Sequence, residues 1–296
     1  MRRLTLIAIP YLWLLALFLV PFLIVMKISL SEYALSIPPY SPYLDLSAGW
    51  AGLVKFLSQL DLENYIFLTT DDLYWKAYLS SLKIATLSTV ITLLVGFPLA
   101  YGMARAATEW RPTLLMLVIL PFWTSFLIRV YAWMGLLSQE GLINQLLLWL
   151  GVINAPLMIL NTPTAVYIGI VYTYLPFMVL PIYSILEKLD ESLLEAAEDL
   201  GCSRLMAFWL VTVPLAKNGI IAGGFLVFIP ALGEFVIPSL LGGSKTLMIG
   251  KILWEEFFSN RDWPVASAVA IVLLVILIIP ILLFQRNQQN QREADT

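Results

Sequence analysis

The chain has 296 residues, of which 60% are hydrophobic and only 12% are charged, and its formal net charge is −3. Ordinary soluble domains are roughly 45–50% apolar and about 25% charged, so too few polar side chains are present to cover a water-soluble globule. The small negative charge also excludes the basic surface that binding to a nucleic acid backbone requires. The composition therefore predicts a membrane protein.

Six apolar stretches are long enough to cross a bilayer as helices, since about 20 residues at 1.5 Å each span the hydrocarbon core. They lie near 4–27, 78–103, 112–137, 164–186, 218–241 and 264–284. The first is too long for a signal peptide and no A-x-A cleavage pattern follows it, so we expect an uncleaved helix. Prolines within several stretches favour kinked helices around a pathway. The fold class that we expect is an all-α membrane protein of six transmembrane helices, with residues 1–296 forming one domain.

Lysine and arginine are distributed unevenly between the segments that connect these stretches. With the N-terminus inside, the inner segments are 1–3, 104–111, 187–217 and 285–296, and the outer segments are 28–77, 138–163 and 242–263. The inner segments hold nine Lys and Arg residues and the longer outer segments hold five. Because positively charged loops stay in the cytoplasm, we expect both termini to be cytoplasmic. The outer segments also hold ten acidic residues, a pattern that favours the approach of cations but that solvated acidic loops explain equally well.

The 187–217 segment interrupts the hydrophobic pattern with a short amphipathic helix. Apolar residues recur along it at helical spacing and leave an acidic opposite face: Leu189, Leu193, Ala196, Ala197 and Leu200. Ser192 and Glu195 have the spacing of a capping box, and Gly201 is typical of a residue that ends a helix with a positive φ. Such a helix suits insertion into a groove of another protein. The alternative is a helix on lipid headgroups, which usually carries Lys and Arg where this one is acidic.

The same segment contains Glu195-Ala196-Ala197, then Gly201 after three residues, and then Val211–Pro214 after nine more. This spacing resembles the EAA loop of the permeases of binding-protein-dependent ABC importers, whose pattern ends in I-x-L-P where this chain has two valines. The resemblance implies a type I importer permease (MetI-like) architecture. It also implies that Glu195, Ala196, Ala197 and Gly201 belong to a coupling helix that docks into separate ATPase subunits. Those subunits would use ATP and Mg²⁺, and this chain would carry no cofactor.

Three further stretches are similar to spermidine/putrescine permeases, and the resemblance covers most of the chain from about residue 65. They are Pro121–Trp133, Phe228–Gly243 and Trp254–Pro264, the last resembling the putrescine-type member in particular. The resemblance implies a permease subunit of an ATP-driven polyamine importer in a bacterial inner membrane, forming half of the translocation pathway. Its implied partners are a homologous second permease, two copies of an ABC ATPase subunit, a periplasmic polyamine-binding protein and the polyamine itself.

Arg129 and Glu234 are the ionisable residues deepest within the expected spans. A charge near the bilayer centre costs about 2.5–3.5 kcal/mol on an insertion scale, so each should face a cavity or a partner. Counted along straight helices from the inner ends of their spans, the two residues lie at nearly the same depth. Two interpretations stay open: a structural Arg129–Glu234 ion pair, or Glu234 facing the pathway as the counter-charge for a substrate ammonium group. The two interpretations are compatible if Glu234 exchanges Arg129 for the substrate ammonium group when the substrate enters.

Aromatic and acidic residues near these positions extend the expected substrate pathway. Trp123, Tyr172 and Tyr174 can offer cation–π contacts to an organic cation, although scattered aromatic residues on bundle helices more often serve packing. Glu255 lies in the last outer segment beside other acidic residues and tryptophans. We expect it either to attract cations at the entrance or to contact the extracytoplasmic binding protein.

Residues for covalent or metal chemistry are scarce. The chain has no histidine, and its single cysteine, Cys202, excludes an internal disulfide or a multi-thiolate metal site. The run 242–246 (GGSKT) lacks both glycines that the G-x-x-x-x-G-K-[ST] phosphate loop requires before its lysine. We therefore expect a transport subunit without a catalytic or metal site. The alternative function is an ion-coupled secondary transporter of small organic cations, although those commonly contain inverted repeats that this sequence lacks.

Overall fold

The computed structural model describes residues 2–43, 49, 54, 56, 58–244 and 246–294, and the side chains of most of these. Helices dominate, and the strands of the described residues form a single two-stranded antiparallel hairpin. The chain divides into two compact units that are described separately here. Unit 1 comprises residues 1–77 and 252–296, and unit 2 comprises residues 78–251.

Within the described part of the chain, five helical runs are long and apolar enough to cross a membrane: Ile7–Ser29, Asp72–Arg105, Pro163–Leu186, Arg204–Leu232 and Trp263–Leu282. A sixth crossing results if the bent pair Arg111–Trp123 and Phe126–Trp149 counts as one span. The all-helical architecture expected from the apolar stretches is thus confirmed. The fourth of these runs, expected near 218–241, begins at Arg204, because short helices within the charged segment continue directly into it.

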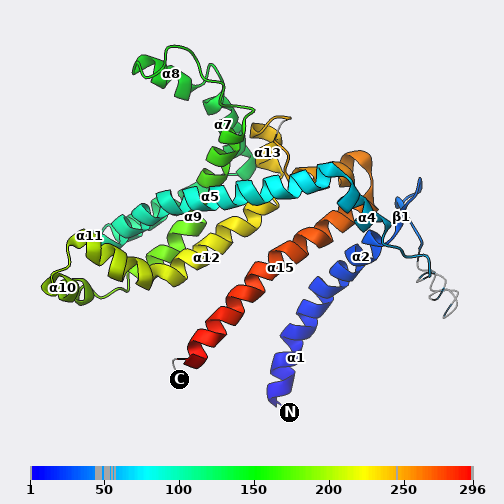
Figure 1. Cartoon of the computed structure of the whole chain (residues 1–296), viewed down its shortest axis with the longest axis horizontal. Coiled ribbons are helices and arrows are strands. Elements are labelled where there is room, and N and C mark those ends of the chain that lie inside the picture. Colours follow the sequence, from blue (N-terminus) through cyan, green and yellow to red (C-terminus); the bar gives the residue numbers. More distant parts are fainter. Residues whose placement is uncertain are drawn as a thin grey trace. The chain divides into compact units, whose positions relative to one another are not determined.

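Unit 1 combines the N-terminal and C-terminal helices with a two-stranded hairpin and shorter helices. Its elements are α1 (Arg2–Leu14), η1 (Leu15–Leu19), α2 (Val20–Ser29), β1 (Glu32–Tyr33), β2 (Tyr40–Ser41), α4 (Glu63–Thr70), η5 (Glu255–Asn260) and α15 (Trp263–Ala294). Helix α15 contacts α2 and α4 (Figure 1). The Lys27 ammonium group lies 4.0 Å from the centroid of the Tyr40 ring, a cation–π contact that joins the end of α2 to the hairpin.

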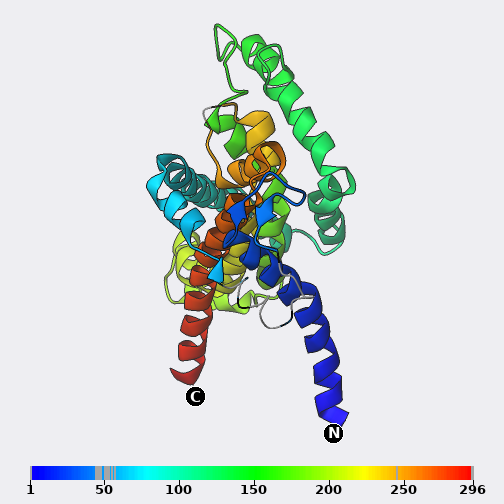
Figure 2. The same ribbon diagram turned by 90° about the vertical axis from the view of Figure 1, so that its right-hand side faces the viewer.

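Unit 2 contains the other helices. They are α5 (Asp72–Arg105), which enters from unit 1, α6 (Arg111–Ile119), η3 (Leu120–Trp123), α7 (Phe126–Leu137), α8 (Leu142–Trp149), α9 (Pro163–Leu186), α10 (Ser192–Asp199), α11 (Arg204–Ala207), η4 (Phe208–Thr212), α12 (Val213–Leu232), α13 (Val236–Leu241) and α14 (Ile249–Trp254). The most extensive helix pairing in this unit is between α9 and α12, which lie side by side (Figure 1; Figure 2).

Two glycines allow α9 and α12 to approach closely. A Cβ atom at Gly219 would lie 2.8 Å from the Pro181 carbonyl oxygen, and one at Gly223 would lie 2.9 Å from the Met178 sulfur. Within a bilayer, helix association depends on packing and close backbone approach, so small residues at the contact are favoured. The α9–α12 pair therefore forms the closely packed centre of unit 2.

The third apolar stretch does not form one helix. Its two parts, Arg111–Trp123 and Phe126–Trp149, meet at an angle of 91°. Pro121 lies within the short turn η3, and the backbone then leaves the helical region at Thr124 and Ser125, whose ψ angles are 150° and 137°. By contrast, Pro98 in α5 and Pro176 in α9 lie inside continuous helices. The sequence predicts kinks at such prolines, and at Pro121 the kink is a complete break.

Candidate functional site

Helix α10 belongs to unit 2 and lies beside the C-terminal end of α5 (Figure 1). It ends at Gly201, whose φ of +87° is left-handed. The Gly201 amide donates to the Glu198 carbonyl, and the Cys202 amide donates to the Ala197 carbonyl. These paired bonds form a Schellman motif, which satisfies the last carbonyls of a helix and favours glycine at the left-handed position. The helix end predicted from Gly201 is confirmed.

The residues expected to couple this chain to an ATPase lie together on α10 and its end. Glu195, Ala196 and Gly201 are exposed, and Ala197 is half-buried. Large apolar side chains next to them are also exposed: Leu193, Leu200, Leu205 and Met206. An exposed apolar surface with small residues at its centre has the character of a docking surface for another protein.

The capping box expected at Ser192 and Glu195 is wrong. Ser192 is already inside α10, and the helix start has no capping hydrogen bond from the preceding Glu191 side chain. The Asp190 carboxylate instead accepts the Ser192 amide hydrogen at 3.0 Å. Two hydrogen bonds from Ser192 hold the pKa of Asp190 below its usual value. The bond from the backbone amide has the larger effect, and the bond from the side chain has the smaller one. The Asp190 carboxylate thus accepts the amide hydrogen that the Glu195 carboxylate would accept in a capping box.

Glu234 lies at the break between α12 and α13 and is only 7% exposed. Its Oε1 accepts the amide hydrogens of Phe235, Val236 and Ile237 at 3.1, 3.0 and 3.4 Å. Its Oε2 accepts the hydroxyl hydrogen of Tyr174 on α9 at 2.5 Å. A negative side chain over the free amides of a helix start is favourable because it satisfies them and complements the helix dipole. The structure therefore gives Glu234 a capping role that reasoning from depth alone missed.

The start of α14 packs against the same break. The Ile249 amide donates to the Ser81 hydroxyl on α5 at 2.8 Å. A Cβ atom at Gly250 would lie 2.3 Å from the Gly233 carbonyl oxygen and 2.7 Å from that of Glu234. Only a glycine fits there without moving the backbone, so the start of α14 lies directly against the backbone of the break.

Arg129 and Glu234 do not form an ion pair among the interactions of the described residues. The Arg129 guanidinium carbon lies 5.2 Å from the Phe122 ring centroid and 6.0 Å from that of Phe126. Its Nε and Nη1 atoms are buried and have no hydrogen-bond partner in the described part of the chain. The predicted pairing assumed straight helices, and the 91° bend that precedes Arg129 removes the equal depth on which it rested.

The three aromatic residues of the expected pathway lie in different surroundings. Tyr174 is buried against Glu234, as described above, whereas Trp123 in η3 is 69% exposed. Tyr172 meets Trp133 edge-on, with ring centroids 5.3 Å apart. Both line a cavity of about 490 Å³ whose other walls include Tyr167. Only Tyr174 of the three contacts the Glu234 carboxylate.

Glu255 belongs to unit 1, where it begins the π-helical turn η5. The next residue, Glu256, makes the specific contacts of this turn. Its carboxylate accepts hydrogen bonds from the Tyr74 hydroxyl and the Asn260 side chain, both at 2.9 Å. No hydrogen bond or ion pair is found for the Glu255 side chain within the described interactions of unit 1. Of the two carboxylates at this turn, that of Glu256 is therefore hydrogen-bonded, and that of Glu255 has no such bond among the described residues.

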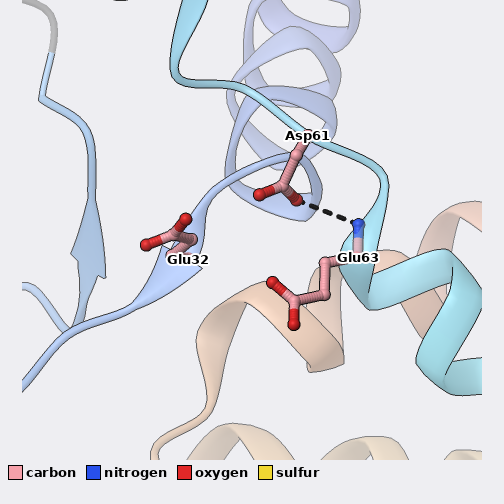
Figure 3. A group of neighbouring side chains, drawn as sticks. All are labelled: Glu32, Asp61 and Glu63. Atoms are coloured by element: carbon pink, nitrogen blue, oxygen red, sulfur yellow. Dashed lines mark hydrogen bonds between the residues drawn. The ribbon is translucent and has the colours of Figure 1, made fainter.

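Unit 1 also gathers three acidic residues that sequence reasoning did not connect (Figure 3). Glu32 lies on β1, Asp61 precedes α4 and Glu63 begins α4, and one carboxylate oxygen of each lies within 4.8 Å of the others. The Glu63 amide donates to Asp61 at 2.9 Å. They line a cavity of about 380 Å³ together with Asp262. The long separation of Glu32 from the other two along the chain gave no sequence signal for this grouping.

Burial affects one of these acids in particular. Asp262 precedes α15, and its Oδ1 accepts the Val265 amide hydrogen at 3.0 Å. Loss of solvation raises the pKa of Asp262 above its usual value, and the nearby Glu256 carboxylate adds to the increase, although the Val265 amide opposes it. This part of unit 1 therefore has a strongly negative character.

Known proteins resemble the chain along most of its length. The permease protein PotB of the spermidine/putrescine transport system of Escherichia coli (strain K12) is 43% identical over 257 residues, covering 80% of this chain and 94% of that protein. PotB of Haemophilus influenzae is 41% identical over 280 residues, covering 95% of this chain and 92% of that protein.

A solved structure shares the fold of the chain, and a family description matches its sequence. The fold matches that of a bacterial ABC transporter that imports the acidic polysaccharide alginate, with a TM-score of 0.67, 16% identity and 96% of each chain covered. Residues 4–289 match the family described as the inner membrane component of binding-protein-dependent transport systems. This is a family of transport components and not of enzymes. The chain is a multi-pass protein of a bacterial inner membrane and belongs to the family of binding-protein-dependent ABC importer permeases.

Proposed function

We propose that this chain is one permease subunit of an ATP-driven importer of polyamines such as putrescine and spermidine. The observation that carries the proposal is the identity of 41–43%, over most of the chain, to permeases named for spermidine and putrescine transport. The acidic residues gathered in unit 1 agree with a cationic substrate, because negative surfaces raise the local concentration of cations.

The proposed complex contains the partners that such a subunit needs. A homologous second permease forms the other half of the pathway, a periplasmic binding protein delivers the polyamine, and two ABC ATPase subunits bind ATP with Mg²⁺. The alginate importer, a relative in fold, is known in complex with its ligand-bound periplasmic protein. In the proposed orientation both termini and the 187–217 segment face the cytoplasm. The exposed surface of α10 that contains Glu195, Ala196, Ala197 and Gly201 then docks into an ATPase subunit.

The transport cycle in this proposal alternates between two states that expose the pathway to opposite sides. ATP binding brings the ATPase subunits together and moves α10, and this favours one of the two states. No covalent chemistry takes place on this chain. Its role is to offer a route of suitable charge and to convert the movement of α10 into opening and closing.

The proposed pathway contacts begin from the Glu234–Tyr174 pair. Oε1 of Glu234 accepts hydrogen bonds from three backbone amides, whereas Oε2 has the Tyr174 hydroxyl as its one partner among the described residues. A substrate ammonium group replaces that hydroxyl and gains a charge-assisted hydrogen bond without disturbing the cap. Trp123 and Tyr172 offer ring faces to the methylene chain and its charges. Glu255, in the outer turn of unit 1, attracts the cation at the entrance.

The substrate class is tested with the assembled complex in lipid nanodiscs, together with its binding protein. We expect putrescine or spermidine, bound to that protein, to stimulate ATP hydrolysis several-fold. Neutral sugars and acidic oligosaccharides are the matched controls and should give no stimulation. Stimulation by a sugar but not by any polyamine would overturn the proposed substrate.

A further inference from the structure

Two arginines flank the short connection between α5 and α6 and reach the same nearby segment. Arg105, the last residue of α5, forms an ion pair with Glu191, and Arg111, the first residue of α6, lies 3.9 Å from Glu187. Both glutamates lie between the end of α9 and the start of α10. The chain leading into α10 is therefore attached at two points to the α5–α6 corner of unit 2.

Both arginine side chains are largely packed against the protein, since each is only 25% exposed. The Arg111 Nε atom also donates to the Ala106 carbonyl at 3.0 Å. The Arg105 guanidinium carbon lies 5.6 Å from the centroid of the Tyr101 ring. Each guanidinium group is thus positioned by neighbouring groups of its own corner, and Glu187 and Glu191 contact it there.

The chain that leaves α10 is attached to the same face of α5. The Phe208 ring meets the Phe97 and Tyr101 rings edge-on, with centroids 5.6 and 5.5 Å away. Phe97, Tyr101 and Arg105 follow at intervals of four residues, so they lie along one face of the helix. The last turns of α5 therefore hold α10 on both sides, through Glu191 before it and Phe208 after it.

We propose that the Arg105–Glu191 ion pair, supported by Arg111–Glu187, is a positioning link that transmits the movement of α10 to α5 during transport. The inference rests on the proposed function, in which α10 docks into an ATPase. With both flanks attached, a displacement of α10 must carry the end of α5 with it. Without the ion pair, residues 187–191 can flex and absorb the displacement. Partly exposed ion pairs add little to folding stability, so loss of this one should loosen the link while the complex still assembles.

The test uses charge reversal in the complete complex, reconstituted in proteoliposomes with its binding protein. The variants are Arg105→Glu, Glu191→Arg and the two together. The number of polyamine molecules taken up per ATP hydrolysed is measured, along with the amount of ATPase subunit that co-purifies. Each single variant should lower uptake per ATP at least fivefold and retain the ATPase. The double variant, in which the opposite charges face each other again, should return to within twofold of the unmodified complex.

Two further sets of variants make the result specific. Lys76→Glu and Asp72→Lys break an exposed ion pair of 2.7 Å at the other end of α5 and should leave uptake per ATP unchanged. Arg105→Gln is a milder change that should lower uptake per ATP less than Arg105→Glu does. It replaces Arg105→Glu in the test if charge reversal prevents membrane insertion.

Several outcomes would overturn the inference while leaving the proposed function intact. These are normal uptake per ATP in both single variants, a double variant that does not recover, or loss of the ATPase subunit from the single variants, which would make the pair a docking contact. Absence of ATP-driven polyamine uptake by the unmodified complex would instead overturn the proposed function, and the inference with it.

Discussion

Glu234 uses its two carboxylate oxygens for different purposes. One oxygen satisfies three backbone amides of its own chain segment, and the other joins α9 through Tyr174. A carboxylate buried in a membrane protein is costly unless it is fully hydrogen-bonded, and this arrangement supplies the bonds without a cationic partner. Arg129, in contrast, leaves two buried nitrogen atoms without hydrogen bonds among the described residues.

Double-mutant cycles can separate these pairings. Because Tyr174 and Glu234 are bonded, Tyr174→Phe and Glu234→Gln should be non-additive, with a coupling of about 0.5–3 kcal/mol in the free energy of unfolding. Arg129→Gln and Glu234→Gln should instead add to within about 0.5 kcal/mol, because the structure does not pair these residues. Unfolding of the detergent-solubilised variants measures both cycles. Recovery of stability in the Arg129–Glu234 double variant would contradict the structure and support the ion pair.

Asp262 predicts a dependence of stability on pH whose sign follows from its raised pKa. A carboxyl group with a higher pKa in the folded than in the unfolded state contributes stability below its unfolded pKa and loses it as the pH rises through the folded pKa. Asp262→Asn keeps an oxygen acceptor for Val265 and removes the charge. The variant should therefore be more stable than the unmodified chain at pH 8, and the difference should shrink toward pH 4.

The matched control is Asp190→Asn, since the pKa of Asp190 is lowered. Here the sign reverses, because a lowered pKa gives stability above the unfolded pKa that is lost in acid. Asp190→Asn should be less stable than the unmodified chain at pH 8, and the two should converge in acid. Thermal unfolding between pH 4 and pH 8 measures both variants. A benefit of Asp262→Asn that grows toward acid would contradict the assignment of burial as the main cause.

At the scale of secondary-structure elements, the break between α12 and α13 is held by the fit of α14 against it. Gly250→Ala places a methyl group 2.3 Å from the Gly233 carbonyl oxygen. Backbone atoms cannot move aside easily, so we expect the free energy of unfolding to fall by about 1–3 kcal/mol or more. Gly102→Ala is the control, because nothing lies within 4 Å of its added Cβ atom in α5. That change should be neutral or stabilising by up to about 1 kcal/mol. Equal stability of the two variants in thermal unfolding would show that α14 does not rest on the break.

Several elements could be predicted from the sequence because their signals are local. Hydrophobic length alone indicates the long helices, and the apolar spacing from Leu189 to Leu200 with Gly201 after it predicts α10 and its end. The exposure of Glu195, Ala196 and Gly201 in the structure suits the docking role that the EAA spacing implies. That role itself stays a prediction.

Other features depend on geometry that no local pattern contains. The capping box predicts that the Glu195 carboxylate accepts the Ser192 amide hydrogen, but the Asp190 carboxylate accepts it instead. The depth of Arg129 was counted along a straight helix, and the departure of Thr124 and Ser125 from helical geometry invalidates that count. The proximity of Glu32 to Asp61 and Glu63 depends on contacts between distant parts of the chain, such as the hydrogen bond from the Asp61 amide to the Leu30 carbonyl. In each case the three-dimensional geometry decides between alternatives that the sequence pattern leaves open.

At the scale of the whole molecule, the orientation in the membrane stays a prediction that the single cysteine can test. Cys202 follows Gly201 at the end of α10 and is partly exposed. A membrane-impermeant maleimide should label it in inside-out vesicles and not in intact spheroplasts, because the 187–217 segment is expected in the cytoplasm. The isolated subunit is the fairer sample, since a docked ATPase would cover the site. Labelling only from the outside would invert the orientation.

The central claim is that this chain moves a polyamine by means of ATP hydrolysed on partner subunits. The most direct measurement is uptake of labelled putrescine by proteoliposomes that contain the two permeases and the ATPase, with the binding protein outside. Our account predicts uptake only when ATP and Mg²⁺ are enclosed, no uptake when the ATPase subunits are omitted, and no effect of dissipating proton or sodium gradients. Uptake that proceeds without ATP and collapses with an ion gradient would contradict it and identify an ion-coupled transporter instead.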